Sequence, residues 1–370
     1  MSFSSSSSRL YGLDTLRALA IVLVFMNHYL LFVSEGGAFG FWGEIGWVGV
    51  DLFFALSGYL IGNQIFAALR SEHGFSLPRF YARRFLRTLP SFYAVLALYY
   101  LWPAFRGDSA LLPLWKFLTF TQNINLTPGT AFSHAWSLCV EEQFYVLLPA
   151  VALAIAACRR SLLWAWLAVA ASLIVGMLLR ATLWEEYVHL PRGGLGYYKY
   201  IYYASWCRFD ELVAGVALAL LKNYHPIAWT RLTAYGNRTL LAGIAGTALM
   251  LYVFLTDHYG YWVTVLGYPA LAASFTLLLI AALSPSSILY KVRVPGAASL
   301  ALWSYAIYLL HKQLCILLRP LLQDIGYGPD SLPAILVMII LSIATGWLLY
   351  AVVETPFMRL RARYVPANHA

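Results

Sequence analysis

Long apolar runs recur along the chain and constrain its fold more than any other feature. Hydrophobic residues make up 61% of the sequence, and charged residues make up 11%, against about 25% in typical soluble domains. Helices satisfy their backbone polar groups internally, so they can cross lipid. The sequence therefore predicts an all-α integral membrane protein. Because a span needs about 20 apolar residues, we expect about ten of them, at 13–33, 46–68, 89–105, 136–157, 162–182, 201–221, 239–256, 262–283, 299–318 and 333–353.

Lys and Arg residues of the predicted loops concentrate on one side of the membrane. With the N-terminus on that side, the basic stretches 79–87, 159–160 and 359–363 all face the same compartment. Cytoplasmic loops carry such an excess, so we expect both termini to be cytoplasmic. The same bias accounts for most of the net charge of +9 without a nucleic-acid partner.

The ends of the chain differ in composition from the rest. Residues 1–9 are predicted to be a disordered, Ser-rich tail, residues 10–358 the membrane domain, and residues 359–370 a basic cytoplasmic tail. The four cysteines lack the spacing of metal ligands, so we expect no metal site.

The first apolar run, residues 12–33, carries Arg17 and His28. Their offset of eleven residues corresponds to about 1100° of helical rotation, close to three full turns, so both side chains share one face. Asp14 lies on nearly the same face. A charge within a membrane helix usually points into the protein or a wet cavity. The alternative is a snorkelling arginine and a histidine bonded to a neighbouring helix. Their shared face favours the wall of a cavity.

Ionisable residues from several other spans are predicted at about the depth of His28. Because isolated charges in lipid are costly, we expect them to pair around a central polar cavity. Histidine is a natural general base near neutral pH, and a neighbouring carboxylate is expected to orient it. The set comprises His28, Asp51, Glu141, Glu142, Arg208, Asp210, Glu211, His311 and Lys312.

A second, basic layer is predicted at the cytoplasmic side. Arg84 and Arg87 lie one turn apart on one helix face, and Arg17 lies at the same depth. Guanidinium groups bind phosphate in a bidentate manner, which suggests a phosphate-bearing donor that enters from the cytosol. The alternative is that these arginines only follow the positive-inside rule.

Seven motifs occur in order along the chain. They are Arg17 with His28, GVDLFFALSGYLI, YARRFLRTLP, WSLCVEEQFYVLLP, RFDELVAGVALA, YAIYLLH and VETP. Together they resemble the acyltransferase-3 family of integral membrane O-acyltransferases, which modify bacterial surface carbohydrates. The resemblance implies a multi-pass protein of the bacterial inner membrane. It would move an acyl group, most often acetyl from acetyl-CoA, to a hydroxyl of an extracytoplasmic or lipid-linked carbohydrate.

The resemblance also assigns roles to residues. His28 would be catalytic, either as a base or as the carrier of an acyl-imidazole, and Asp51 or a glutamate of the span 136–157 would orient it. Arg17, Arg84 and Arg87 would bind the acyl-CoA. We further expect catalytic roles for Asp51, Glu141 and Glu142, and substrate contacts from Arg208, Asp210 and His311.

Many members of the family carry a fused esterase-like domain outside the membrane, whereas this sequence ends after the last predicted span. We therefore expect a stand-alone domain that acts directly on its acceptor or works with a separate protein. The alternative function is a transporter or flippase of a glycan or lipid intermediate. The lack of an evident internal repeat argues against it.

Overall fold

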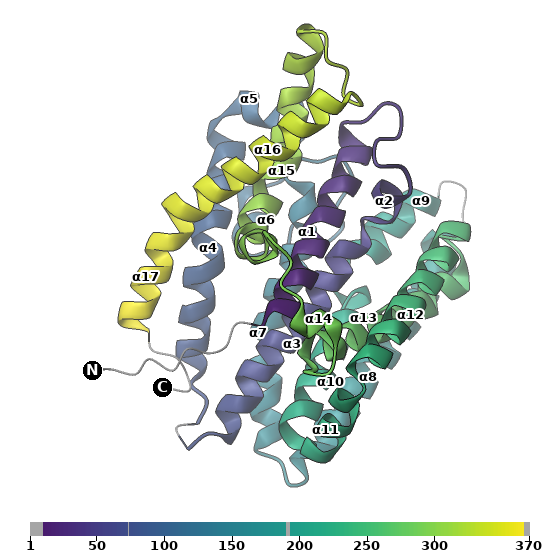
Figure 1. Cartoon of the computed structure of the whole chain (residues 1–370), viewed down its shortest axis with the longest axis vertical. Coiled ribbons are helices and arrows are strands. Elements are labelled where there is room, and N and C mark those ends of the chain that lie inside the picture. The colour runs from purple at the N-terminus through teal and green to yellow at the C-terminus, as the bar shows by residue number, and fades with distance from the viewer. Residues whose placement is uncertain (1–9, 73, 190–192, 366–370) are drawn as a thin grey trace.

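The computed structural model describes residues 10–72, 74–189 and 193–365. Every regular element in this part of the chain is a helix, so the predicted all-α class is confirmed (Figure 1). The predicted tail at residues 1–9 and the last part of the basic tail, residues 366–370, lie outside the described residues. Residues 359–364 of that tail belong to helix α17 (Thr355–Tyr364).

Eight helical segments of the described chain are long and apolar enough to cross a membrane. This supports the predicted multi-pass architecture. They are α1 (Tyr11–Phe32), α3 (Val48–Arg70), η1 (Ser133–Ala135) with α7 (Trp136–Ala156), α8 (Ser161–Tyr187), α12 (Gly236–Thr256), η4 (Val263–Gly267) with α13 (Tyr268–Leu283), α15 (Ala297–Asp324), and α16 (Leu332–Leu349) with η5 (Tyr350–Glu354) and α17.

The other two predicted spans correspond to helices of a different kind. Helix α4 (Leu77–Leu101) has 25 residues, but its first half is rich in arginine. Helix α10 (Asp210–Tyr224) has only 15 residues and begins later than the predicted start at residue 201. The chain before it forms a π-helix, η2 (Tyr197–Tyr202), and a 3₁₀ turn, η3 (Ser205–Cys207). Irregular backbone is tolerated at this point because protein surrounds it.

Short helices connect these segments. They are α2 (Gly40–Ile45), α5 (Pro103–Arg106), α6 (Leu114–Leu118), α9 (Gly193–Gly196), α11 (Pro226–Ala234) and α14 (Ile288–Lys291). In the view of Figure 1, α1 runs through the middle of the bundle, with α16 and α17 on one side and α8 and α12 on the other.

Helices α3 and α10 pack against each other more extensively than any other pair of helices in the described chain. Helix α1 packs against both α3 and α15. Small residues allow the approach of α10 to α3, since a Cβ atom on Gly58 would lie 2.0 Å from the carbonyl oxygen of Leu212, and one on Gly215 would lie 2.3 Å from that of Ala55. The tight contact buries the first turn of α10, which carries charged residues.

Basic segments gather at one end of the bundle. The start of α4 lies beside the end of α17, where Arg83 donates a hydrogen bond to the carbonyl of Val365. The start of α1 lies beside α14, and the guanidinium of Arg293 stacks 4.4 Å from the ring of Tyr11. This arrangement agrees with the bias in loop charge, and the cytoplasmic location of this end stays a prediction.

We predict that Gly58→Ala destabilises the protein by about 1–3 kcal/mol, because the added methyl group must push α10 away from α3. Thermal unfolding in detergent measures the effect. Gly328→Ala is the control, since a Cβ at that position meets no atom within 4 Å. Equal melting temperatures for the two variants would show that the α3–α10 contact is not tight.

Candidate active site

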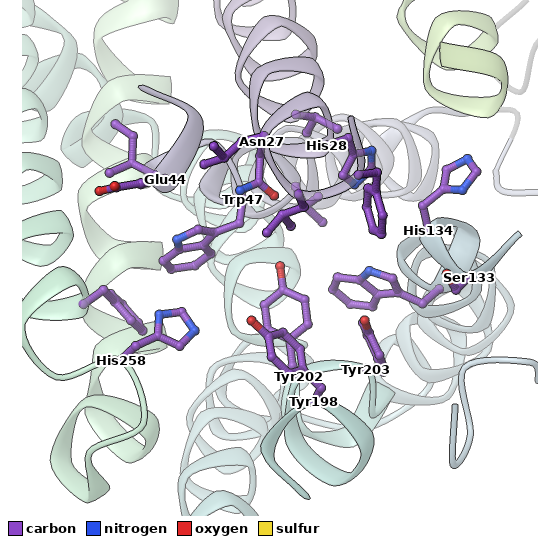
Figure 2. Close-up of a pocket in the computed structure, with 18 of the residues that line it drawn as sticks. Asn27, His28, Glu44, Trp47, Ser133, His134, Tyr198, Tyr202, Tyr203 and His258 are labelled. Carbon is purple, nitrogen blue, oxygen red and sulfur yellow. The ribbon is translucent and has the colours of Figure 1, made fainter. Parts of the chain in front are cut away.

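One cavity of about 340 Å³ lies at the end of the bundle opposite the basic segments, and we call it the outer cavity. Figure 2 shows His28, Ser133 and His134 on one side of it and Glu44, Trp47 and His258 on the other. Its floor and walls are largely aromatic, with contributions from Trp136, Tyr198, Tyr202, Tyr203, Phe254 and Tyr259. Lys312 lies at the histidine side.

His28 forms a hydrogen bond with His311, which joins α1 to α15. Nδ1 of His28 lies 2.8 Å from Nε2 of His311, and Nδ1 of His311 lies 2.8 Å from the carbonyl oxygen of Ile307. A carbonyl oxygen only accepts, so neutral His311 carries its proton on Nδ1 and accepts with Nε2. His28 must then donate from Nδ1. This chain of bonds leaves Nε2 of His28 as the basic nitrogen.

Asp51 does not orient His28, contrary to the expectation from the sequence. It is fully buried and forms an ion pair with Arg208. The guanidinium of Arg208 also lies against the rings of Trp136, Tyr202 and Tyr268, at 5.3, 4.5 and 4.3 Å from their centroids. The group that contacts His28 is instead His311, which we had expected to bind substrate.

Asp210 also has a structural partner. Arg180 donates to its carboxylate at 2.5 and 3.0 Å, and donates further to the carbonyls of Cys207 and Val265. Neither Arg208 nor Asp210 lines the outer cavity, so the expected substrate contacts are not supported. The two ion pairs fix the start of α10 against α3 and α8. Arg180 was visible in the sequence as a charge inside an apolar run, but its partner was not.

A second cavity of about 340 Å³ lies on the side of the basic segments, and we call it the inner cavity. Arg17, Arg84 and Arg87 all line it, as their predicted common role requires. Glu141 and Glu142 line it too, rather than accompanying His28. Glu142 lies 3.8 Å from Arg84, whose guanidinium stacks 4.0 Å from the centroid of the Tyr145 ring.

Glu141 and Glu142 were expected at the depth of His28, but they lie closer to the basic end of the bundle. The reason is that α7 begins at the outer cavity and runs from there towards the inner cavity. Trp136, its first residue, lines the outer cavity, and Glu141 follows five residues later. Five residues advance an α-helix by about 7.5 Å, which is enough to bring Glu141 to the arginines.

A thin wall separates the two cavities. Val50 lines both of them, and Tyr308 lines the inner cavity while its ring centroid lies 6.3 Å from that of His28. The hydroxyl of Tyr308 lies 2.7 Å from the hydroxyl of Ser137 and donates to the carbonyl of His134. The single polar cavity that we predicted is therefore two cavities with Tyr308 and Ser137 between them.

His134 is a further histidine of the outer cavity. Its ring lies 5.8 Å from that of His28, and its Nε2 lies 3.3 Å from the carbonyl oxygen of Leu309. Its buried Nδ1 has no hydrogen-bond partner among the described residues. Within residues 10–72, 74–189 and 193–365, no group of His, Cys, Asp or Glu side chains has the geometry of a metal site.

His258 lies at the opposite side of the outer cavity, where its ring centroid is 5.5 Å from that of Trp47. Burial and the positive charge of Arg208 lower the pKa of His258 to about 4. The imidazole is therefore neutral at neutral pH. Its buried Nε2 lacks a hydrogen-bond partner within the described chain.

The fold is that of a multi-pass membrane protein with two polar cavities. Residues 10–351 match the family model described as "Acyltransferase domain", which covers most of the chain. The protein therefore belongs to the acyltransferase-3 family, as its motifs predicted, and the predicted enzyme class is confirmed.

Several curated proteins are similar to this chain. YrhL of Bacillus subtilis, whose assignment as a peptidoglycan O-acetyltransferase is provisional, is 29% identical over 85% of this chain and 50% of its own length. The peptidoglycan O-acetyltransferase OatA of Listeria monocytogenes is 27% identical over 84% and 50%. The O-acetyltransferase OatA of Staphylococcus aureus is 22% identical over 94% and 57%. The chain thus spans about half the length of these relatives. No solved structure matches it at a significant level.

We predict that Asp51→Ala destabilises the protein by about 3–5 kcal/mol, because it leaves the buried Arg208 uncompensated. The double variant Asp51→Ala with Arg208→Met removes both charges, so it should regain most of the melting temperature and retain acyl transfer. A stable double variant that has lost transfer would instead support the catalytic role first expected for Asp51.

Proposed function

We propose that this chain is an O-acetyltransferase of a bacterial cell membrane that moves an acetyl group from cytosolic acetyl-CoA to a carbohydrate hydroxyl on the far side. The observation that carries the proposal is the pairing of an arginine-lined inner cavity with a histidine-containing outer cavity, separated by Tyr308 and Ser137. Two relatives are named for peptidoglycan, so peptidoglycan strands or their lipid-linked precursors are the acceptors to test first.

The inner cavity suits the donor. Arg17, Arg84 and Arg87 offer planar, permanently charged groups for the phosphates of coenzyme A. Glu142 limits the motion of Arg84 through their ion pair. With the phosphates held there, the pantetheine arm would extend towards Tyr308 and bring the thioester to the wall between the cavities.

The outer cavity suits the acceptor and the chemistry. Nε2 of His28 takes the hydroxyl proton while the hydroxyl oxygen attacks the thioester carbonyl carbon. The carbon–sulfur bond then breaks, and the proton passes from His28 to the departing thiolate to give free coenzyme A. His311 accepts the hydrogen bond from Nδ1 of His28 throughout, so it holds the ring and stabilises the imidazolium.

Aromatic side chains around the outer cavity favour a sugar over a small polar acceptor. Trp47, Tyr198 and Tyr203 present flat, amphipathic surfaces, and such walls with a few polar groups are typical of ligand sites. Glu44 and His258 at the side remote from His28 offer hydrogen-bond partners to a further part of the acceptor.

We predict that His28→Ala lowers acetyl transfer by a factor of about 10²–10⁴, the range of general-base contributions. The assay uses detergent-solubilised protein, radiolabelled acetyl-CoA and solubilised peptidoglycan fragments, and measures label on the glycan. His189→Ala is the control, because His189 is exposed and outside both cavities.

Two results would contradict this assignment. Near wild-type transfer by His28→Ala would remove His28 from the chemistry. Glycan movement across vesicles without any labelling of the glycan would indicate the alternative function, a transporter or flippase.

We predict that Arg84→Ala weakens the binding of acetyl-CoA about 10- to 100-fold, since a hydrogen bond to a charged group contributes about 1.5–3 kcal/mol. Isothermal titration with acetyl-CoA measures the affinity directly. Arg79→Ala is the matched control on the same helix, because Arg79 is exposed and outside the inner cavity. Unchanged affinity in Arg84→Ala would show that the arginines do not form the donor site.

A further inference from the structure

Lys312 is a buried cation of the outer cavity without a carboxylate partner among the described residues. Only 7% of the residue is exposed. The fully buried Arg180 and Arg208 pair with Asp210 and Asp51, whereas no Asp or Glu of the described chain forms an ion pair with Lys312. Its ammonium instead donates to the hydroxyl of Ser133 at 3.3 Å and lies 3.9 Å from the centroid of the Phe32 ring.

Such a charge is expensive to bury. Removing one partner from a buried ion pair is strongly destabilising, because the remaining charge is uncompensated. A hydroxyl oxygen and an aromatic face recover part of this cost, since each presents partial negative charge to the ammonium. A buried charge without a partner of opposite charge lowers the stability of a protein, and such groups are expected mainly at functional sites. The environment of Lys312 thus favours the arrival of a negative charge.

Lys312 lies in the same cavity as His28, the proposed general base. The Phe32 ring below the ammonium lies 5.8 Å from the His28 ring. Lys312 directly follows His311, so a single helix, α15, supplies both the hydrogen-bond partner of His28 and this cation. Ser133, which accepts from Lys312, retains its own hydroxyl proton for donation into the cavity.

We propose that Lys312 and Ser133 stabilise the oxyanion of the transfer reaction, an inference that rests on the proposed acetyltransferase function. As the acceptor oxygen bonds to the carbonyl carbon, the carbonyl electron pair moves onto oxygen and creates a negative charge. The ammonium of Lys312 and the hydroxyl of Ser133 donate hydrogen bonds to that oxygen. When the carbon–sulfur bond breaks, the carbonyl re-forms and Lys312 keeps its proton. Lys312 is then a catalytic residue.

The kinetics of Lys312→Met test this role. A donor that acts on the developing oxyanion contributes about 10²–10³-fold to kcat. We therefore expect kcat to fall by that factor, with little change in KM for acetyl-CoA or for peptidoglycan fragments. Lys312→Arg keeps the charge and should stay within about tenfold of wild type. Lys116→Met, which alters a lysine outside both cavities, is the control and should be unchanged.

Several outcomes would overturn the proposal. A Lys312→Met variant with wild-type kcat would do so. So would a raised KM for the glycan at unchanged kcat, which would mean that Lys312 binds an acidic group of the acceptor. Wild-type protein without any acetyl transfer would overturn the proposed function and this role together. Active wild type with an equally active Lys312→Met would overturn only the role of Lys312.

A second variant covers the case in which Lys312→Met does not fold. Ser133→Ala removes the other proposed donor and keeps the ammonium, so we expect kcat to fall about 10²-fold at unchanged KM for both substrates. Unchanged kcat in Ser133→Ala would then count against the oxyanion site.

Discussion

Charges buried among membrane helices must be compensated, and this constraint arranges the interior of the protein. Arg208 pairs with Asp51 from α3, and Arg180 of α8 pairs with Asp210 of α10. These ion pairs hold the start of the short helix α10 against α3 and α8. Gly58 of α3 and Gly215 of α10 also allow the two helices to approach each other closely. The irregular chain before α10 then carries Tyr198, Tyr202 and Tyr203, which line the outer cavity. The aromatic part of the site thus depends on ion pairs that do not themselves face it.

Other ionisable residues are divided between two cavities rather than gathered in one. The inner cavity is lined by Arg17, Arg84, Arg87, Glu141 and Glu142, and the outer cavity, on the opposite side of Tyr308, is lined by His28, His134 and Lys312. This division suits a reaction whose two substrates come from different compartments. The wall is held by hydrogen bonds among Tyr308, Ser137 and the backbone of His134.

Much of this could be predicted from the sequence, because apolar length and loop charge are local properties. The helical class, most of the spans, the shared face of Arg17 and His28, and the grouping of Arg84 with Arg87 all follow from spacing along one helix. Partners from different helices could not be predicted in this way. The sequence suggested that Asp51 contacts His28, whereas Asp51 pairs with Arg208 and His28 bonds to His311. The spacing of residues along one helix does not indicate which helices pack together. Lys312 was visible as an intramembrane charge, but its lack of a carboxylate emerges only from the packing.

In the proposed reaction, an acetyl group passes from the inner cavity to the outer one. This transfer can be measured in sealed proteoliposomes of uniform orientation, with labelled acetyl-CoA on one side and peptidoglycan fragments on the other. We predict labelled glycan only when acetyl-CoA is on the side of the basic loops and the glycan is on the opposite side. Equal labelling with both substrates on the side of the basic loops would contradict the account, because the histidine-lined cavity would then not be the acceptor site.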